Sequence, residues 1–296
     1  MAEQVKAYSD IFIKYLFGSP NSSDLLLSFL NSMQSAHEFP LLTSAEVLNP
    51  FNLQTALTDK LSILDIRARD QDDRLYNIEI QVASQKDYSE RSLYYWAKIY
   101  SGQLNESEPY SQLRPVIGVH ILNFVLFPEL NEVENCFVLK HTENPDLVLT
   151  DHLSLHYVEI PKLPEGHFDT QLERWIAFLK NEGKEGFDMT ILLKEDPAIA
   201  KAHERYLAFT NDDQARMAYE ARIAFQRDQL SREEAAKLEG IEQGIEQGIE
   251  QGIEKGIQKG KRENKLEIAH NLRAIGMSAQ QIAQVTGLSV EEIEKL

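Results

Sequence analysis

The sequence contains a single cysteine, Cys136, among its 296 residues. One cysteine excludes an internal disulfide and a zinc site built from several thiolates, which is typical of a reducing compartment. No apolar run approaches the roughly 18 residues that a membrane-spanning helix needs. The first ten residues also lack the basic and then apolar layout of a signal peptide. We therefore expect a cytoplasmic protein that makes no contact with a membrane.

Positive charge is also scarce. The chain has 30 Lys and Arg residues against 47 Asp and Glu residues, for a net charge of −17. Phosphate contacts are made by Lys and Arg, so proteins that bind nucleic acid usually present a basic surface. This balance argues against nucleic-acid binding by the surface as a whole. A local basic strip or a bound metal could still supply the positive charge.

Two neighbouring segments have the alternation of β-strands. In YNIEIQVA (76–83), the polar Asn77, Glu79 and Gln81 alternate with aliphatic residues, as expected of a half-buried strand. The preceding segment, LSILDIRARD (61–70), has an aspartate between two aliphatic residues, where aspartate is disfavoured. An aspartate at this place in a predicted strand is therefore unusual.

The loop between these segments predicts how they pair. Asp70 and Arg74 flank the short loop QDD as an opposite-charge pair, which predicts a hairpin. If these two residues face each other, the same register places Asp65 opposite Glu79. Cross-strand neighbours have Cβ atoms roughly 4.5–5.5 Å apart, so the two carboxylates would repel unless a cation lay between them. The hairpin therefore predicts a site for a divalent cation.

The rest of the first 236 residues predicts an α/β fold. An amphipathic segment (84–104), with Leu93, Trp96, Ala97 and Tyr100 on its expected buried face, precedes the continuous apolar run PVIGVHILNFVLF (115–127). A hairpin, a helix and then a buried strand imply a crossover connection and a mixed sheet. Further helices are predicted within 8–33, 171–180 and 197–238, and further strands at 45–49, 136–141 and 147–160.

A glycine and isoleucine repeat with a period of four residues occupies 239–261. Its six glycines oppose a helix by roughly 6 kcal/mol in total, so a helix here needs a packing partner. We expect a helical linker that pairs with its own copy in a homodimer, and the alternative is a solvated, partly frayed spacer. The closest histidine pair, HLSLH (152–156), would share one face of a strand but does not by itself predict zinc.

The last segment, 264–296, predicts a compact three-helix bundle. Gly276 can end a helix, SAQQ (278–281) and SVEE (289–292) match the capping box, and Gly287 suits a helix-turn-helix unit. The second helix of such a unit normally presents basic or amide side chains to DNA. Here that helix is acidic, so we rank a folding or assembly role for the tail above DNA reading.

With these residues placed, the sequence resembles the Rpn family of recombination-promoting nucleases, often described as transposases, within the PD-(D/E)XK nuclease superfamily. The resemblance spans most of the chain in a consistent order. It rests on DIFIKYLFG (10–18), FLNSM (29–33), LDIRARD (64–70), YNIEIQVA (76–83), YSERSLYYWAKIYSGQL (88–104), YSQLRPVIGVHIL (110–122) and the glycine-repeat tail.

The resemblance implies a restriction-endonuclease-like mixed sheet flanked by helices and a metal-dependent cleavage of DNA. Asp65 and Glu79 would be the metal ligands, with Mg²⁺ expected and Mn²⁺ or Ca²⁺ as alternatives. Gln81 stands where most members of the superfamily have lysine, and glutamine cannot contribute a positive charge. Lys14 is the candidate to replace that cation, and Asp10 is a candidate for a further metal or water contact.

Each candidate also has a purely structural explanation. Asp65 could pair with Arg67 or Arg69, and Gln81 could simply face solvent. An (i, i+4) salt bridge would account for Asp10 and Lys14. Weaker candidates for the cation are Lys60, Lys86 and Arg91. We expect Tyr94, Tyr95 and Tyr100 to belong to the core rather than to stack on bases.

The sequence thus predicts a nuclease-like domain over 1–236, a helical linker over 237–263 and a helical, helix-turn-helix-like tail over 264–296. The expected function is a DNA endonuclease with low sequence specificity, linked to recombination or mobile DNA. One alternative is a degenerate nuclease fold that binds DNA or a partner without cutting. The other is an assembly protein in which the repeat and the tail are the active parts.

Overall fold

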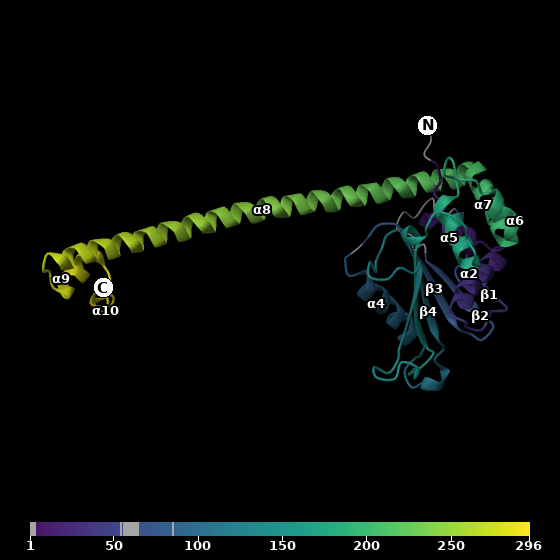
Figure 1. Cartoon of the computed structure of the whole chain (residues 1–296), viewed down its shortest axis with the longest axis horizontal. Helices are drawn as coiled ribbons and strands as arrows, with labels where there is room; N and C mark the ends of the chain where they lie inside the picture. Colours follow the sequence, from purple (N-terminus) through teal and green to yellow (C-terminus); the bar gives the residue numbers. More distant parts are fainter. Residues whose placement is uncertain (1–3, 54, 56–64, 85) are drawn as a thin grey trace. The chain divides into compact units, whose positions relative to one another are not determined.

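The computed structural model describes residues 4–53, 55, 65–84 and 86–296 (Figure 1). The chain divides into two compact units, Met1–Phe225 and Gln226–Leu296. The first unit is built from a sheet and helices, and the second is helical. A helix, α8 (Asp213–Ala274), begins in the first unit and continues into the second.

A mixed sheet forms the centre of the first unit and, within the described residues, has six strands in the order β1-β2-β3-β4-β6-β5. The pairs β3–β4 and β4–β6 are parallel, and the other pairs are antiparallel. Helices cover the sheet, which confirms the predicted α/β class. The strands are β1 (Ala45–Val47), β2 (Ile66–Asp70), β3 (Leu75–Gln81), β4 (Val116–Leu122), β5 (Glu134–Val138) and β6 (Leu153–Glu159).

The hairpin of β2 and β3 has the register that the sequence predicts. Ile66 pairs with Ile78, and the same register runs to the pair of Arg69 and Leu75, next to the loop that Asp70 and Arg74 flank. Arg74 Nε lies 2.6 Å from Asp70 Oδ2, and the main-chain nitrogen of Asp70 donates to the carbonyl of Arg74 at 3.1 Å. This opposite-charge pair fixes the register, because a slip by one residue would reverse the face of every side chain.

One face of the sheet carries the main apolar core. The buried aliphatic residues of β2, β3 and β4 on this face pack against buried residues of the covering helices. Phe29 stacks on Phe17 at 5.0 Å and meets Trp175 edge-on at 5.9 Å. The helices that contribute to this core are α1 (Asp10–Gly18), α2 (Ser23–Ala36), α5 (Gln171–Asn181), α6 (Thr190–Glu195), α7 (Pro197–Asn211) and the beginning of α8, with Ala215, Ala218 and Tyr219.

The other face is covered over β4 by α4 (Tyr88–Ser101), the helix that connects the parallel strands β3 and β4 (Figure 1). Tyr88 and Ser92 are its buried residues. Ser92 Oγ and the Tyr157 hydroxyl are 2.6 Å apart, and Trp96 Nε1 donates to the Val116 carbonyl at 2.7 Å. α4 therefore docks on the sheet through these hydrogen bonds and through an apolar cluster to which it contributes Tyr88 and Trp96.

The predicted buried face of this helix is wrong in part. Leu93 is 48% exposed and Ala97 is exposed, whereas Trp96 and Tyr100 are half-buried as expected. The prediction misplaces the contact face because Tyr88, Ser92 and Trp96 form it, and Ser92 and Trp96 also use a hydroxyl or indole group for hydrogen bonds. Tyr94 and Tyr95 are also exposed rather than part of the core, at 64% and 39%.

The predicted helical stretch 197–238 is interrupted at Asp212. α7 ends at Asn211, Asp212 has an extended backbone, and its side chain accepts from the main-chain nitrogen of Ala215 at 2.9 Å. Aspartate is a favourable N-cap because it satisfies a donor of the first helical turn. Asp212 thus ends one helix and begins the next.

The second unit confirms the predicted helical character of the repeat and the capping signals of the tail. The isoleucines of the repeat, between Ile241 and Ile257, are 50–59% exposed, and a Cβ added at any of its six glycines would meet nothing within 4 Å. The capping boxes at Ser278 and Ser289 begin α9 (Ala279–Thr286) and α10 (Val290–Glu294). Ala269, Ile282, Leu288 and Ile293 form a small core.

The two glycines predicted to have special positions in the tail have positive φ angles, +91° at Gly276 and +68° at Gly287. The main-chain nitrogen of Gly287 donates to the carbonyl of Ala283 at 2.9 Å, which closes the last turn of α9. Among the helices described, none is both long enough and apolar enough to cross a lipid bilayer.

Candidate active site

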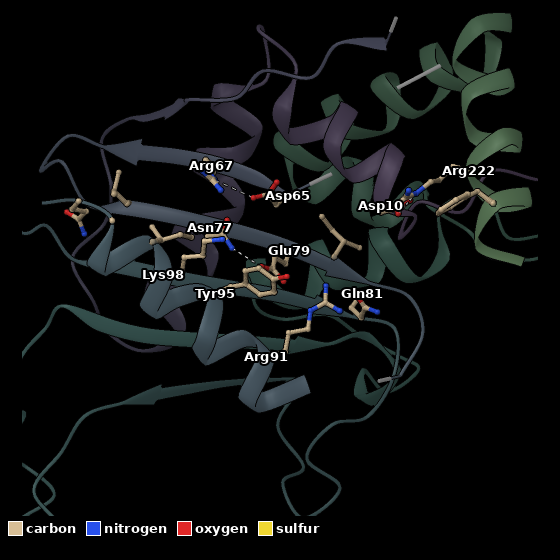
Figure 2. A pocket seen from close by; sticks show the side chains of 16 residues that line it. Asp10, Asp65, Arg67, Asn77, Glu79, Gln81, Arg91, Tyr95, Lys98 and Arg222 are labelled. Carbon is tan, nitrogen blue, oxygen red and sulfur yellow. Dashed lines mark hydrogen bonds and ion pairs between the residues drawn. The ribbon is translucent and has the colours of Figure 1, made fainter. Parts of the chain in front are cut away.

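A cleft of about 740 Å³ opens on the α4 side of the sheet, beside β2 and β3. Four of the five residues that the sequence singles out line it, namely Asp10, Asp65, Glu79 and Gln81. Figure 2 shows their side chains around this cleft, with Arg91 and Tyr95 reaching toward it from α4. Residues from α1, the β2–β3 hairpin, α4 and the start of α8 therefore meet at one place.

Asp65 and Glu79 reach this cleft from adjacent strands. Asp65 directly precedes β2, and the register in which Ile66 pairs with Ile78 places it beside Glu79 of β3. Both carboxylates are largely shielded, with side-chain exposures of 12% and 18%. The structure thus brings together the two acidic residues that the hairpin predicts as neighbours.

The surroundings of Glu79 disfavour its negative charge. Burial, the largest influence, and the charge of Asp65 raise the pKa of Glu79, whereas an Asn77 hydrogen bond and the charge of Arg91 lower it without offsetting the rise. Asn77 Nδ2 donates to Glu79 Oε1 at 3.0 Å. A cation between the two carboxylates would relieve both the burial cost and the repulsion.

His120 of β4 does not supply that positive charge. Its Nδ1 lies 4.0 Å from Glu79 Oε2 and 3.1 Å from the Tyr88 hydroxyl. Complete burial, assisted by nearby His156, lowers the pKa of His120 to about 3. The His120 ring is therefore neutral at pH 7. It is a polar neighbour of the Glu79 carboxylate and does not form a charged pair with it.

Asp65 forms an ion pair with Arg67, one of the two arginines predicted as its structural partner. Asp65 nevertheless still lines the cleft. Arg67 Nε lies 3.5 Å from Asp65 Oδ2, and the Arg67 side chain is 55% exposed. Exposed pairs of this length contribute about 0–1 kcal/mol. Arg67 itself lines the cleft, so this pair is compatible with a role in binding a negatively charged substrate.

Lys14 lies beneath the hairpin and is not one of the residues that line the cleft. Its Nζ donates to the main-chain carbonyls of Asn49, at 3.0 Å, and of Asp65. Burial lowers the pKa of Lys14 to about 8, against the opposing attraction of Asp65. In this position Lys14 fixes the backbone that carries the Asp65 carboxylate.

Gln81 and Asp10 lie at the edges of the cleft. Gln81 Nε2 donates to the Ala83 carbonyl at 3.1 Å, so its amide is oriented by its own strand end. Asp10 Oδ2 accepts from Arg222 Nε at 2.8 Å, and its Oδ1 accepts from the main-chain nitrogen of Ile11 at 2.8 Å. Asp10 therefore forms an ion pair with α8 at the cleft wall.

The wall formed by α4 contains Arg91, a weaker candidate from the sequence, together with Tyr95 and Lys98, which the sequence does not predict at the site. Arg91, Tyr95 and Lys98 follow the i, i+4, i+7 spacing of one helical face and all line the cleft. The Arg91 guanidinium lies 5.6 Å from the centre of the Tyr95 ring, within the range of a cation–π contact. The helical spacing of these three residues is a signal that the sequence alone contains.

The charge of this cleft differs from that of the whole chain. Among its described lining residues, Arg67, Arg91, Lys98 and Arg222 are positive, and three are acidic. The chain as a whole has a net charge of −17. Basic residues therefore lie beside the carboxylates, although the chain as a whole is acidic. Of the weaker candidates, Lys86 is not a lining residue and Lys60 lies outside the described residues.

Comparison with known proteins assigns most of the chain to a family. Residues 7–236 match the model of the PD-(D/E)XK nuclease family transposase, and this range includes the cleft and all five candidate residues. Residues 262–296 match the model of the C-terminal HTH domain of the Rpn/YhgA-like nuclease family. No curated protein and no solved structure matches the chain. The chain belongs to the PD-(D/E)XK nuclease family of transposases and carries the C-terminal HTH domain of Rpn/YhgA-like nucleases.

Proposed function

We propose that the protein is a metal-dependent DNA endonuclease with low sequence specificity that acts in recombination or on mobile DNA. The observation that carries this proposal is the pair of shielded carboxylates, Asp65 and Glu79, which line a cleft with a basic wall. Family membership supports a nuclease. The paired carboxylates support the dependence on a metal, and the basic wall supports a polyanionic substrate.

The donor set fits a hard divalent cation. Asp65 and Glu79 offer carboxylate oxygens, which suit Mg²⁺ and also Mn²⁺ or Ca²⁺. The raised pKa of Glu79, caused by burial and by the neighbouring Asp65 charge, is consistent with a site that a cation completes. When bound, such a cation supplies an activated water nucleophile and neutralises charge on the phosphoryl group.

The other candidate residues have distinct roles in this proposal. Gln81 orients the attacking water or a phosphate oxygen through its amide, and it adds no positive charge. Arg91 supplies the missing cation near the scissile phosphate, since its charge already acts on Glu79. Lys14 is a positioning residue that holds the backbone of Asp65. Asp10 keeps Arg222 at the rim, through their ion pair, for contact with DNA.

The cleft supplies most of the DNA affinity in this proposal, and the tail adds to it. The HTH match supports DNA binding by the tail. However, α10 presents Glu291, Glu292 and Glu294, which would repel phosphates. We therefore assign 1–236 to cleavage, 237–263 to a helical connection and 264–296 to an accessory contact with DNA.

We further propose that the protein is a homodimer that pairs through the repeat 239–261. The exposed isoleucines of the repeat and the open space around its glycines support a close approach of two helices. Sedimentation of the full chain at micromolar concentration is expected to show a dimer. A monomer at that concentration would contradict this part of the proposal.

Plasmid cleavage tests the nuclease assignment. Supercoiled plasmid is incubated with the full chain in Mg²⁺ or in EDTA, beside the variants Asp65→Ala and Glu46→Ala. Glu46 is a matched control because it is an exposed acidic residue of β1 outside the cleft. Relaxation or linearisation that needs Mg²⁺, survives in Glu46→Ala and disappears in Asp65→Ala is expected. No cleavage by the wild type with Mg²⁺, Mn²⁺ or Ca²⁺ would favour the non-cutting alternative.

A truncated chain separates the nuclease from the assembly alternative. A variant that ends at residue 238 lacks the repeat and the tail but keeps the whole first unit, Met1–Phe225. We expect this variant to cut plasmid in Mg²⁺ with weaker binding to DNA. A truncated protein that remains folded but has lost all cleavage would instead place the essential part of the protein in the repeat or the tail.

A further inference from the structure

A second cluster of metal-ligating side chains lies on the opposite face of the sheet from the cleft. Cys136 of β5 and His156 of β6 are direct cross-strand partners, and His37 follows the last turn of α2. Glu134 lies two residues before Cys136 on the same strand. His156 alternates with Leu155 and Tyr157, which pack in the separate apolar cluster under α4. The cluster therefore belongs to the α2 side.

The ligand atoms of this cluster are close together. His37, Cys136 and His156 each offer one ligand atom, and these atoms all lie within 4.8 Å of one another. Cys136 Sγ is 3.7 Å from His156 Nε2. Two ligands held at about 2.3 Å and about 2.0 Å in a tetrahedral arrangement would lie about 3.5 Å apart. The cysteine and histidine pair therefore already has the spacing of a zinc site.

Glu134 occupies the place of a supporting carboxylate. Its Oε1 lies 2.8 Å from His156 Nδ1, and its Oε2 forms a hydrogen bond with His37 Nε2. A carboxylate on the second ring nitrogen commonly orients a histidine whose first nitrogen binds zinc. His156 is bound in this manner, with Nδ1 on Glu134 and Nε2 facing the thiol.

The Glu134 carboxylate of this cluster is buried. The Glu134 side chain is only 3% exposed, and its ion-pair partners among the described residues are His37 and His156. A carboxylate that is buried away from water is costly unless positive charge lies close to it. A divalent cation held by the histidines and the thiol would supply that charge.

We propose that His37, Cys136 and His156 bind one Zn²⁺ ion, with Glu134 as the supporting carboxylate or fourth ligand. The mixture of thiol and imidazole ligands selects zinc over the Mg²⁺ of the cleft. The bound ion ties the end of α2 to the strands β5 and β6 at the sheet edge. Its role is structural, and the site is separate from the carboxylates at which DNA is cut.

The geometry also resembles a catalytic cysteine, histidine and glutamate triad, but the thiol is unsuited to that role. Burial, together with the charge of Glu134, raises the pKa of Cys136 to about 12. A nucleophilic cysteine needs a lowered pKa. A bound metal instead deprotonates its thiol ligand directly, so zinc binding does not depend on an activated cysteine.

Thiol labelling of the full-length protein tests the site, because Cys136 is the single cysteine. The protein is treated with a chelator, dialysed and alkylated with iodoacetamide, with and without one equivalent of Zn²⁺. Zinc is expected to slow alkylation about tenfold or more, because the bound thiolate is no longer available. Millimolar Mg²⁺ is expected to leave the rate unchanged. An unchanged rate in Zn²⁺ would overturn the proposal.

Matched variants show which side chains hold the ion. His37→Gln and His156→Ala are expected to lose the protection by Zn²⁺, and His37→Gln suffices if His156→Ala fails to fold, since His37 is partly exposed. His270→Ala removes an exposed histidine and should keep the protection, as should Asp65→Ala in the cleft. Loss of protection in Asp65→Ala, or its retention in His37→Gln, would contradict the proposed ligands.

Binding of Co²⁺ gives an independent spectroscopic result. Cobalt in place of zinc is expected to show a sulfur-to-metal charge-transfer band in the wild type with a stoichiometry of one. The band should be absent in Cys136→Ser and present in His270→Ala. A cobalt spectrum without a thiolate band in the folded wild type would overturn the site.

Discussion

One face of the central sheet packs its apolar side chains against α1, α2, α5 and α7, whereas the other face places Asn77, Glu79 and Gln81 beside a cleft. The two faces come from the same strands, because successive side chains of a strand point in opposite directions. In β3, Ile78 belongs to the first face and Glu79 to the second. Within this one strand, alternate residues therefore pack in the apolar core or line the cleft.

Because the two faces of the sheet carry different kinds of side chain, we expect them to respond differently to substitution. The apolar face loses stability when a side chain is shortened, because a cavity remains. The polar face carries Glu79, a largely shielded carboxylate whose pKa is raised by burial and by the charge of Asp65, so its negative charge is unfavourable without a cation. Replacing such a carboxylate should therefore reduce activity while it leaves or improves the stability of the metal-free fold.

The largest expected effect is on the polar face. Glu79→Gln should reduce plasmid cleavage in Mg²⁺ by about 100-fold or more, because even residues that only support a metal ligand typically contribute roughly 10- to 100-fold. The midpoint of denaturant unfolding without metal should stay the same or rise, since the amide carries no buried charge. A folded Glu79→Gln variant with wild-type cleavage would remove Glu79 from the site.

The opposite response is expected on the apolar face. Phe29→Ala should lower the free energy of unfolding by about 3–5 kcal/mol, as for other buried aromatic residues, since Phe29 is fully buried between Phe17 and Trp175. Denaturant unfolding measures this change. Cleavage per folded molecule should remain close to the wild type at a temperature where the variant is folded. A loss of cleavage in the folded variant would contradict the prediction that this face of the sheet contributes to stability alone.

A smaller effect is expected at the basic wall of the cleft. Arg91→Ala should weaken DNA binding about three- to tenfold and reduce the slope of log affinity against log salt by about one, as for one lost phosphate contact. Lys184→Ala, which removes an exposed charge outside the cleft, is the control. Fluorescence anisotropy with a labelled duplex at several salt concentrations measures both quantities. An equal loss in the two variants would indicate a general charge effect.

The smallest expected effect is a shift in pH dependence. Glu79 must be ionised to hold a cation, and burial raises its pKa above the usual 4.5, so cleavage should fall as the pH decreases through that raised pKa. Asn77→Ala removes a hydrogen bond that lowers this pKa, and so the acid limb of the rate profile should move to higher pH. An acid limb that stays in place, or moves to lower pH, would contradict this relation.

The same shift has a defined consequence for stability. The folded metal-free protein binds the Glu79 proton more tightly than the unfolded chain does. Its contribution to the free energy of unfolding is therefore present below pH 4.5 and is lost as the pH rises through the raised pKa. Glu79→Gln should remove this pH dependence, which denaturant unfolding over a pH series can measure.

The sequence predicts the hairpin and its carboxylates well because both depend on local chemistry. The Asp70 and Arg74 pair sets the register across a short loop, and the position of Asp65 relative to Glu79 follows. The resemblance to the nuclease family then extends from the motifs to the whole first domain. Capping boxes and glycines in the tail are equally local signals, and they are found in the structure.

Long-range contacts are the part that the sequence does not reveal. Lys14 binds the carbonyls of Asn49 and Asp65, which only the folded packing of α1 against the hairpin brings near. α4 docks through Tyr88, Ser92 and Trp96, which combine apolar packing with hydrogen bonds, so the spacing of its aliphatic residues does not identify its buried face. Likewise, the HLSLH pair does not form a site of its own. His152 binds Tyr100, and His156 joins Cys136 and Glu134 from β5.

Direct measurement of metal binding tests the central claim that Asp65 and Glu79 share a cation. Mn²⁺ is titrated into the metal-free full-length protein by calorimetry, beside Asp65→Asn, Glu79→Gln and the control Glu46→Gln. We predict one Mn²⁺ site that is present in the wild type and in Glu46→Gln and is lost in both cleft variants. Undiminished binding in a folded Asp65→Asn or Glu79→Gln protein would contradict the account.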